Sequence, residues 1–198
     1  MRSMLRAFSA AALLLCAGLA AAQETGKLTV DIAAFNSEIE LKPKIKAQLE
    51  SGGLEWGAKD GLVVFTMVNK RFINFDIPNF TRYGTQQTVE LPAGDYKITG
   101  IGLIPSTAFS PEKILNKGAY FNEGIMAFRI EPGQTVTLKV NPVIRKNATF
   151  FINYFMPEIL VAVEQNGQTG AETSVVAKTD ASTPWAGYTG PLKFTPVK

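Results

Sequence analysis

Two stretches in which apolar and polar residues alternate, each interrupted by a turn that contains proline and glycine, constrain the fold of this chain most. The first is Val89 to Leu103 (VELPAGDYKITGIGL), and the second is Met126 to Val140 (MAFRIEPGQTVTLKV). An apolar residue at every second position places one hydrophobic row on one face of a sheet, whereas a helix needs a period of about 3.6 residues. Both stretches therefore predict pairs of β-strands.

The turn residues favour a β-hairpin in each stretch. Pro92 has the φ angle that the second position of a turn requires, and Gly94 can adopt the left-handed conformation of a bulged three-residue hairpin. Pro132-Gly133 is typical of a type II turn. The alternation changes phase at Gly100, which predicts a β-bulge there. Tyr96 is predicted to be a core or corner residue whose hydroxyl group bonds to the backbone.

The same alternation predicts strands in most of the remaining chain. They cover residues 27–35, 62–68, 72–77, 85–91 and 173–178, with two further strands that meet at a bend within 148–163.

The segments between these strands are predicted as loops or short helices. Residues 38–50 support two interpretations: a strand at 38–45, or a helix at 44–50. Residues 54–61, with Trp56, and residues 78–84 are predicted as loops. In the long connection 104–124, Ser110-Pro111 predicts the start of a short helix that Gly118 ends. The fold class expected is an all-β, antiparallel sandwich of the immunoglobulin or prealbumin-like type with one short helix in a long connection.

The beginning of the chain predicts a secretory signal peptide at residues 1–22. Arg2 and Arg6 precede an apolar run, and Ala20-Ala21-Ala22 provide the small residues of a cleavage site. The run is shorter than the about 20 residues of a membrane-spanning helix, so no such span is expected in the mature chain. We expect a periplasmic or secreted protein with a sandwich domain at 23–178 and an irregular, aromatic tail at 179–198.

Composition excludes several kinds of chemistry. The chain has no histidine, which removes Ser-His-Asp and Cys-His catalysis and most transition-metal sites. Cys16 is its only cysteine and lies in the signal peptide, so the mature chain has no disulfide. Lipid attachment at Cys16 is the less favoured interpretation, because Leu15 stands where a small residue is expected. Without the signal peptide the charges nearly balance, and no nucleic-acid partner is expected.

Aromatic residues are the remaining candidates for a site. The sequence has no glycine-rich phosphate loop, calcium loop or nucleophile motif, so no catalytic residue, metal or cofactor is predicted. Aromatic rings stack on sugars and anchor protein interfaces. The predicted binding residues are Trp185, Tyr188, Tyr120 and Phe121, and the alternative is that the aromatic residues of the loops fill the ends of the sandwich.

The run Leu91 to Ile98 (LPAGDYKI) resembles the L-P-x-G-x-Y-x-hydrophobic hairpin of prealbumin-like and carboxypeptidase-regulatory-like β-sandwich modules, which are common in bacterial envelope proteins. The run Phe128 to Leu138 is similar to the later hairpin of the same modules. The resemblance covers residues 62–143 and is architectural. It implies a fold but no activity.

These observations predict a non-enzymatic, exported β-sandwich protein of the bacterial cell envelope. Its partner would be an envelope protein or a glycan, or it would support an assembly. Such a protein should expose an apolar patch that includes some of the loop aromatics. The alternative is a carboxylate-dependent hydrolase that acts on envelope glycans, which should hold two acidic side chains face to face in a deep pocket.

Overall fold

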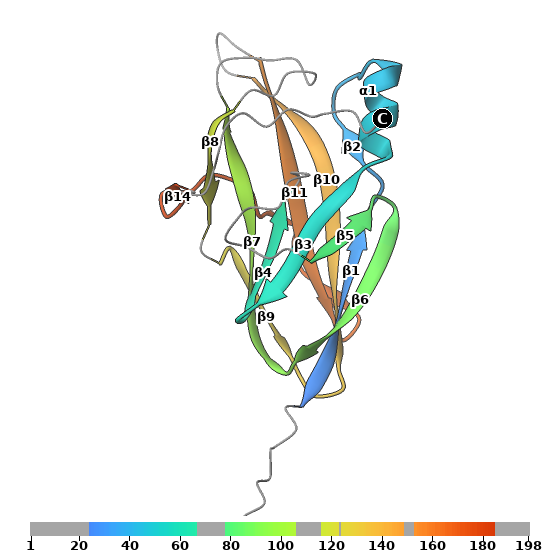
Figure 1. The fold of residues 1–198 in the computed structure, drawn as a ribbon, viewed down its shortest axis with the longest axis vertical. Coiled ribbons are helices and arrows are strands. Elements are labelled where there is room, and N and C mark those ends of the chain that lie inside the picture. Colours follow the sequence, from blue (N-terminus) through green and yellow to red (C-terminus); the bar gives the residue numbers. More distant parts are fainter. Residues whose placement is uncertain (1–23, 67–77, 106–115, 123, 149–152, 185–198) are drawn as a thin grey trace, which may run out of the picture.

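The computed structural model describes residues 24–66, 78–105, 116–122, 124–148 and 153–184, and these form an all-β sandwich of two sheets (Figure 1). The first sheet has the strand order β12 (Gln168–Thr169), β11 (Asn153–Gln165), β10 (Thr135–Ala148), β1 (Thr25–Ile32) and β6 (Thr85–Pro92), with β13 (Thr173–Ser174) beside β11 and β2 (Asn36–Ser37) beside β10. The second has the order β14 (Thr183–Pro184), β8 (Asn116–Phe121), β7 (Gly94–Pro105), β4 (Leu62–Thr66), β3 (Gly53–Lys59) and β5 (Asn79–Arg82), with β9 (Met126–Ile130) beside β7.

Both sheets are mixed. β1 lies parallel to β10, with Leu28 opposite Val136, and β4 lies parallel to β7, with Val63 opposite Ile98. The all-β sandwich predicted from the sequence is confirmed, but the expectation that it is antiparallel throughout is wrong. Parallel neighbours such as β1 and β10 are far apart in the chain, and a local pattern says nothing about the direction in which they meet.

The two stretches with proline–glycine turns are not hairpins. β6 pairs with β1 in the first sheet, whereas β7, directly after the turn, pairs with β4, β8 and β9 in the second. In the same way β9 belongs to the second sheet and β10 to the first. Each turn therefore carries the chain from one sheet to the other. Two strands that face each other across a core show the same alternation as two that lie side by side, so the pattern could not distinguish these cases.

The predicted β-bulge at Gly100 is also absent. The pairing of β4 with β7 runs without a shift from Leu62–Lys97 to Phe65–Gly100. On its other edge β7 changes partner in this region, from β9, which pairs up to Ile98, to β8, which pairs from Ile101. The change of phase in the sequence coincides with that change of partner.

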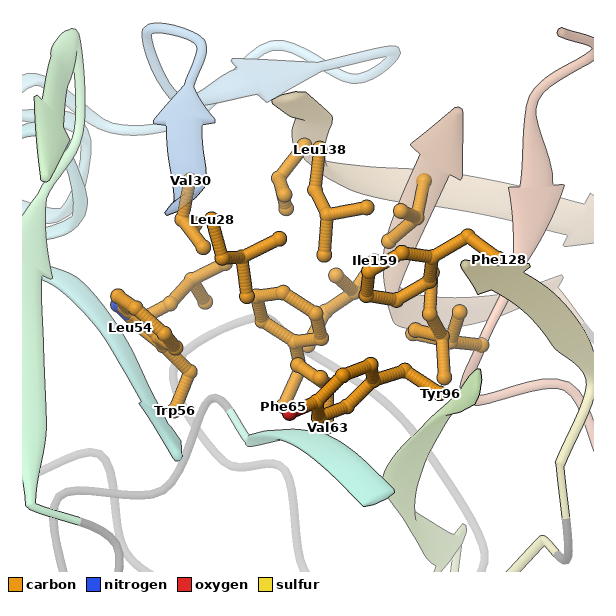
Figure 2. Close-up of a cluster of buried hydrophobic side chains, with 14 of the residues drawn as sticks. Leu28, Val30, Leu54, Trp56, Val63, Phe65, Tyr96, Phe128, Leu138 and Ile159 are labelled. Carbon is orange, nitrogen blue, oxygen red and sulfur yellow. The ribbon is translucent and has the colours of Figure 1, made fainter. Parts of the chain in front are cut away.

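The hydrophobic core lies between the two sheets (Figure 2). Trp56, predicted in a loop, belongs to β3 and is fully buried. Its ring stacks on Phe65 with 6.4 Å between ring centroids, and its indole N–H donates a 2.9 Å hydrogen bond to Thr81 Oγ1. The loop prediction failed because residues 53–57, all buried except for the partly buried Glu55, do not alternate in burial from one residue to the next. The prediction for Tyr96 is confirmed, since it is buried and its hydroxyl donates to Pro92 O at 2.7 Å.

Other segments differ from the prediction in part. The helix alternative at 38–50 is confirmed by α1 (Pro43–Glu50), which begins with proline in its first turn. Residues 78–84 contain β5 instead of forming only a loop, and Gly118 lies within β8 instead of ending a helix. The predicted start of that helix, the strand at 72–77 and residues 149–152 lie outside the described residues. The prediction of two strands that meet at a bend within 148–163 is wrong, because β11 runs without a break from Asn153 through Pro157 to Gln165. In the described part of the chain, no helix has the length and apolar character needed to cross a bilayer.

Candidate functional site

A groove with a volume of about 760 Å³ lies on the outer face of the second sheet, over β4, β7 and β9. Tyr96 and Phe128 point into the core, so their neighbours along each strand point outward. Lys97 of β7 lies opposite Leu62 of β4 on one side and opposite Ala127 of β9 on the other. These three residues form a row across the groove, with a cationic side chain between two apolar ones. The volume is typical of a small-ligand site.

The stem of the Lys97 side chain lies against Gly124. Gly124 has a φ angle of +65°, and a Cβ atom there would lie 2.8 Å from Lys97 Cδ. Glycine is therefore favoured by the backbone conformation, and its lack of a Cβ leaves room for the lysine stem. The Lys97 backbone N–H donates to Gly61 O at 2.8 Å, which ties β7 to the turn between β3 and β4. Within the described residues the Lys97 ammonium group has no ion pair or hydrogen bond.

Asp60 lines the groove from that turn. Its φ angle of +51° is one that only a few residue types, aspartate among them, adopt readily. Gly61 follows with a φ angle of +74°, so the turn is built from two left-handed residues. In the described part of the chain the Asp60 carboxylate, like the Lys97 ammonium group, has no hydrogen bond or ion pair.

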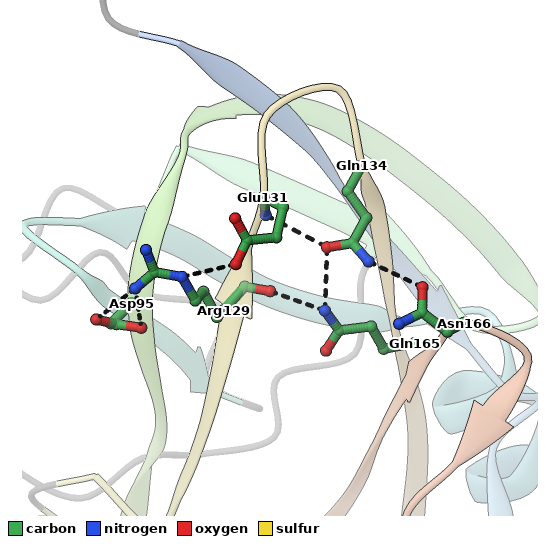
Figure 3. A network of polar contacts seen from close by, with 6 residues as sticks. All are labelled: Asp95, Arg129, Glu131, Gln134, Gln165 and Asn166. Carbon is green, nitrogen blue, oxygen red and sulfur yellow. Dashed lines mark hydrogen bonds and ion pairs between the residues drawn. The ribbon is translucent and has the colours of Figure 1, made fainter.

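Arg129 and Asp95 form a further part of the groove lining, and their charges compensate each other. Arg129 Nη1 donates to both carboxylate oxygens of Asp95, at 2.9 and 3.0 Å, and Nε donates to Glu131 Oε1 at 2.7 Å (Figure 3). The hydrogen bond to Asp95, followed by that to Glu131, raises the pKa of the Arg129 guanidinium. The guanidinium is thus held in a fixed plane by two carboxylates.

The same arginine connects the two sheets through side-chain amides (Figure 3). Gln165, at the end of β11, donates through Nε2 to Arg129 O at 3.2 Å and to Gln134 Oε1 at 3.0 Å. Gln134 Nε2 in turn donates to Asn166 Oδ1 at 3.0 Å. This end of the groove is therefore attached to turns of both sheets.

The structure places Tyr120 and Phe121, two of the predicted binding residues, on opposite faces of β8. Phe121 is half-buried and lines the groove. Tyr120 is only 3% exposed and faces inward over Gly102, and its hydroxyl donates to Val176 O at 2.6 Å. Burial, and to a smaller extent the charge of Glu158, raises the pKa of Tyr120.

Trp185 and Tyr188 lie outside the described residues. A binding role for the four predicted aromatic residues stays a prediction.

Asn122 holds the segment that leads toward Trp185. Its side chain is 1% exposed, and Nδ2 donates to Val175 O at 3.3 Å and to Ala177 O at 2.8 Å. Asn122 Oδ1 accepts a hydrogen bond from Ser182 Oγ, and the backbone carbonyl of Asn122 accepts one from Thr99 Oγ1. Residues 173–184 thus lead from β11 of the first sheet to β8 of the second. The side chain of Asn122, directly after β8, forms hydrogen bonds to this segment.

Sequence analysis missed most of the groove. The outward phase of β7 and β9 could have identified Lys97 and Arg129 as exposed neighbours of buried residues. It could not have shown that Leu62 lies beside Lys97, because β4 and β7 are separated by the whole of β5 and β6 in the chain.

The chain matches no family model, no curated protein and no solved structure. The described residues contain no group of three or more histidine, cysteine, aspartate or glutamate side chains that could hold a metal ion.

Proposed function

We propose that this chain is a non-enzymatic, exported binding protein of the bacterial cell envelope with a prealbumin-like sandwich, and that the groove over β4, β7 and β9 is its binding site. The observation that carries the proposal is the groove itself, about 760 Å³ in volume, with apolar side chains on both sides of a lysine that has no ion pair among the described residues. Phe121, selected from the sequence as a binding residue, adds an aromatic ring to its lining.

The charged groups of the groove favour binding over hydrolysis. A glycosidase needs two carboxyl groups about 5 to 9 Å apart, one of which must stay protonated to act as the acid. Asp95 is 79% exposed, and both of its oxygens accept hydrogen bonds from Arg129. Both oxygens of this exposed carboxylate are thus engaged by the guanidinium. The arrangement is better suited to orienting a bound ligand than to breaking its bonds.

A direct test is ligand binding observed by nuclear magnetic resonance. The isotope-labelled protein is purified from the periplasm, where its first residue is expected to be Gln23, and titrated separately with the peptide and glycan fractions of a bacterial envelope extract. The amide signals of Leu62, Lys97 and Ala127 are expected to shift with at least one fraction.

Two matched variants locate the binding site. Ala127→Trp fills the groove at an exposed position, whereas Gln86→Trp adds the same ring at an exposed position on β6 of the other sheet. The shifts should vanish in Ala127→Trp and persist in Gln86→Trp. A lack of shifts with every fraction, or equal shifts in both variants, would contradict the proposal, and release of new reducing ends from the glycan fraction would favour the hydrolase.

A further inference from the structure

We infer that the groove selects short peptides with free ends, with Lys97 binding the terminal carboxylate and Asp60 the terminal ammonium group. This inference rests on the proposed function, because it assigns a ligand to the same groove. Its basis is the contrast between the charged side chains of the groove that are paired and those that are not. Arg129 is compensated by Asp95 and Glu131, whereas Lys97 and Asp60 have no hydrogen bond or ion pair within the described residues.

Lys97 and Asp60 belong to one rigid frame, although they do not pair with each other. The Lys97 N–H is bonded to the carbonyl group of Gly61, the residue after Asp60, so strand and turn are joined directly. The stem of Lys97 lies against Gly124, and the backbone of Asp60 is left-handed. The backbone positions from which the cation and the anion reach the ligand are thus joined directly, while both side chains stay exposed to it.

Because a cation and an anion line the same groove, the groove favours a ligand that carries both a negative and a positive group. A ligand with only a carboxylate is attracted by Lys97 and repelled by Asp60, and a ligand with only an amine meets the reverse. A zwitterion satisfies both groups. In a free amino acid the two charges sit on one carbon atom, whereas in a peptide each further residue separates them by up to about 3.5 Å. Lys97 and Asp60 form no ion pair with each other, and the groove of about 760 Å³ has more room than one amino acid fills, so we infer a peptide as the ligand.

The apolar part of the groove adds a preference for the middle of the peptide. Leu62 and Ala127 flank Lys97 on its two sides, and Phe121 lies at the end of β8. Such a lining favours an apolar or aromatic side chain between the two charged ends. The volume of about 760 Å³ is large enough for a tripeptide.

The test compares one tripeptide, Ala-Phe-Ala, in its free, N-acetylated and C-amidated forms, titrated into the periplasmic protein and followed by the same amide signals. Removing either end charge should weaken binding to the wild-type protein about fivefold to tenfold, since each lost contact is a charge-assisted hydrogen bond in a solvated groove. The variants Lys97→Met and Asp60→Asn remove exposed side chains, and Lys178→Met, at an exposed position after β13, is the control.

Each variant should cancel the effect of one blocking group. Lys97→Met should bind the free and amidated peptides equally and still discriminate against the acetylated form, whereas Asp60→Asn should show the reverse, and Lys178→Met should behave like wild type. Lack of tripeptide binding, or equal binding of all three forms by the wild-type protein, would overturn the inference. If an envelope fraction still shifts the groove signals in that case, the proposed function stands without it. If no fraction shifts those signals, the proposed function fails as well.

Discussion

Replacing Asn122 with alanine is expected to lower the free energy of unfolding by about 2–3 kcal/mol. The Asn122 side chain is 1% exposed and makes three hydrogen bonds, two donated to Val175 O and Ala177 O and one accepted from Ser182 Oγ. All three tie residues 173–184 to the second sheet.

The magnitude follows from these three bonds. A hydrogen bond in a folded protein contributes about 1 kcal/mol net, and a buried group left without a partner costs about 1–3 kcal/mol. Val175 is buried, so its carbonyl loses a partner that water replaces poorly, whereas Ala177 is exposed and its carbonyl can be hydrated. The 3.3 Å bond to Val175 O is the longer of the two donated bonds and contributes less. The sum is about 2–3 kcal/mol, equivalent to a Tm lower by about 5–10 °C in a chain of this length.

Urea unfolding followed by circular dichroism measures this change, with Ser182→Ala as the matched control. Ser182 also bonds to the Thr179 backbone N–H, and its side chain is less buried, so Ser182→Ala should cost only about 1 kcal/mol. Amide hydrogen exchange should accelerate in residues 173–184 of Asn122→Ala before it does so in β1 or β10. If the two variants differ by less than about 0.5 kcal/mol, or if exchange accelerates equally in all strands, Asn122 does not hold this segment.

The remaining predictions concern the tyrosine hydroxyl groups. Tyr120→Phe should lower the free energy of unfolding by about 1–2 kcal/mol and Tyr96→Phe by less than about 1 kcal/mol, because the carbonyl that accepts from Tyr120 belongs to buried Val176, whereas Pro92 is exposed. Urea unfolding measures both, and the opposite order would be inconsistent with these contacts. Burial raises the pKa values of Tyr83, Tyr96 and Tyr120, so the folded chain keeps phenol protons that the unfolded chain loses above pH about 10. The contribution of these phenols to the free energy of unfolding is therefore complete below pH 10 and is lost as the pH rises through their folded-state pKa values. Unfolding curves from pH 9 to 11.5 should show the free energy of unfolding falling, with a shallower slope for Tyr83→Phe. A flat profile would argue against burial of these phenols.

The alternation of apolar and polar residues predicted which side chains are buried better than it predicted which strands are neighbours. Leu28, Val30, Phe128 and Leu138 lie in the core as their phase indicates. The pattern failed at Trp56, where glycines and buried residues without alternation concealed a strand. It also treated Tyr120 as a loop residue, although a hydrogen bond to a carbonyl group 56 positions later in the chain fixes its place.

Predictions for the groove were less complete, because the groove exists only where three strands meet. The sequence identified Phe121 as a candidate, and the alternation marks Lys97 as an outward-facing residue. Nothing local indicates that Leu62 and Ala127 lie on its two sides, or that Gly124 accommodates its stem. These relations depend on the register between strands that are distant in the chain.

The sequence by itself determined that this chain forms β-strands, that it forms a sandwich, and which rows of side chains are buried, because strand periodicity and burial are local properties of the chain. Only the tertiary structure decided that the turns at Pro92-Ala93-Gly94 and Pro132-Gly133 lead from one sheet to the other, that β1 and β10 run parallel, and that the groove lies over β4, β7 and β9. Strand order and direction are set by the packing of the whole core, and a turn sequence fits both a hairpin and a crossing between sheets.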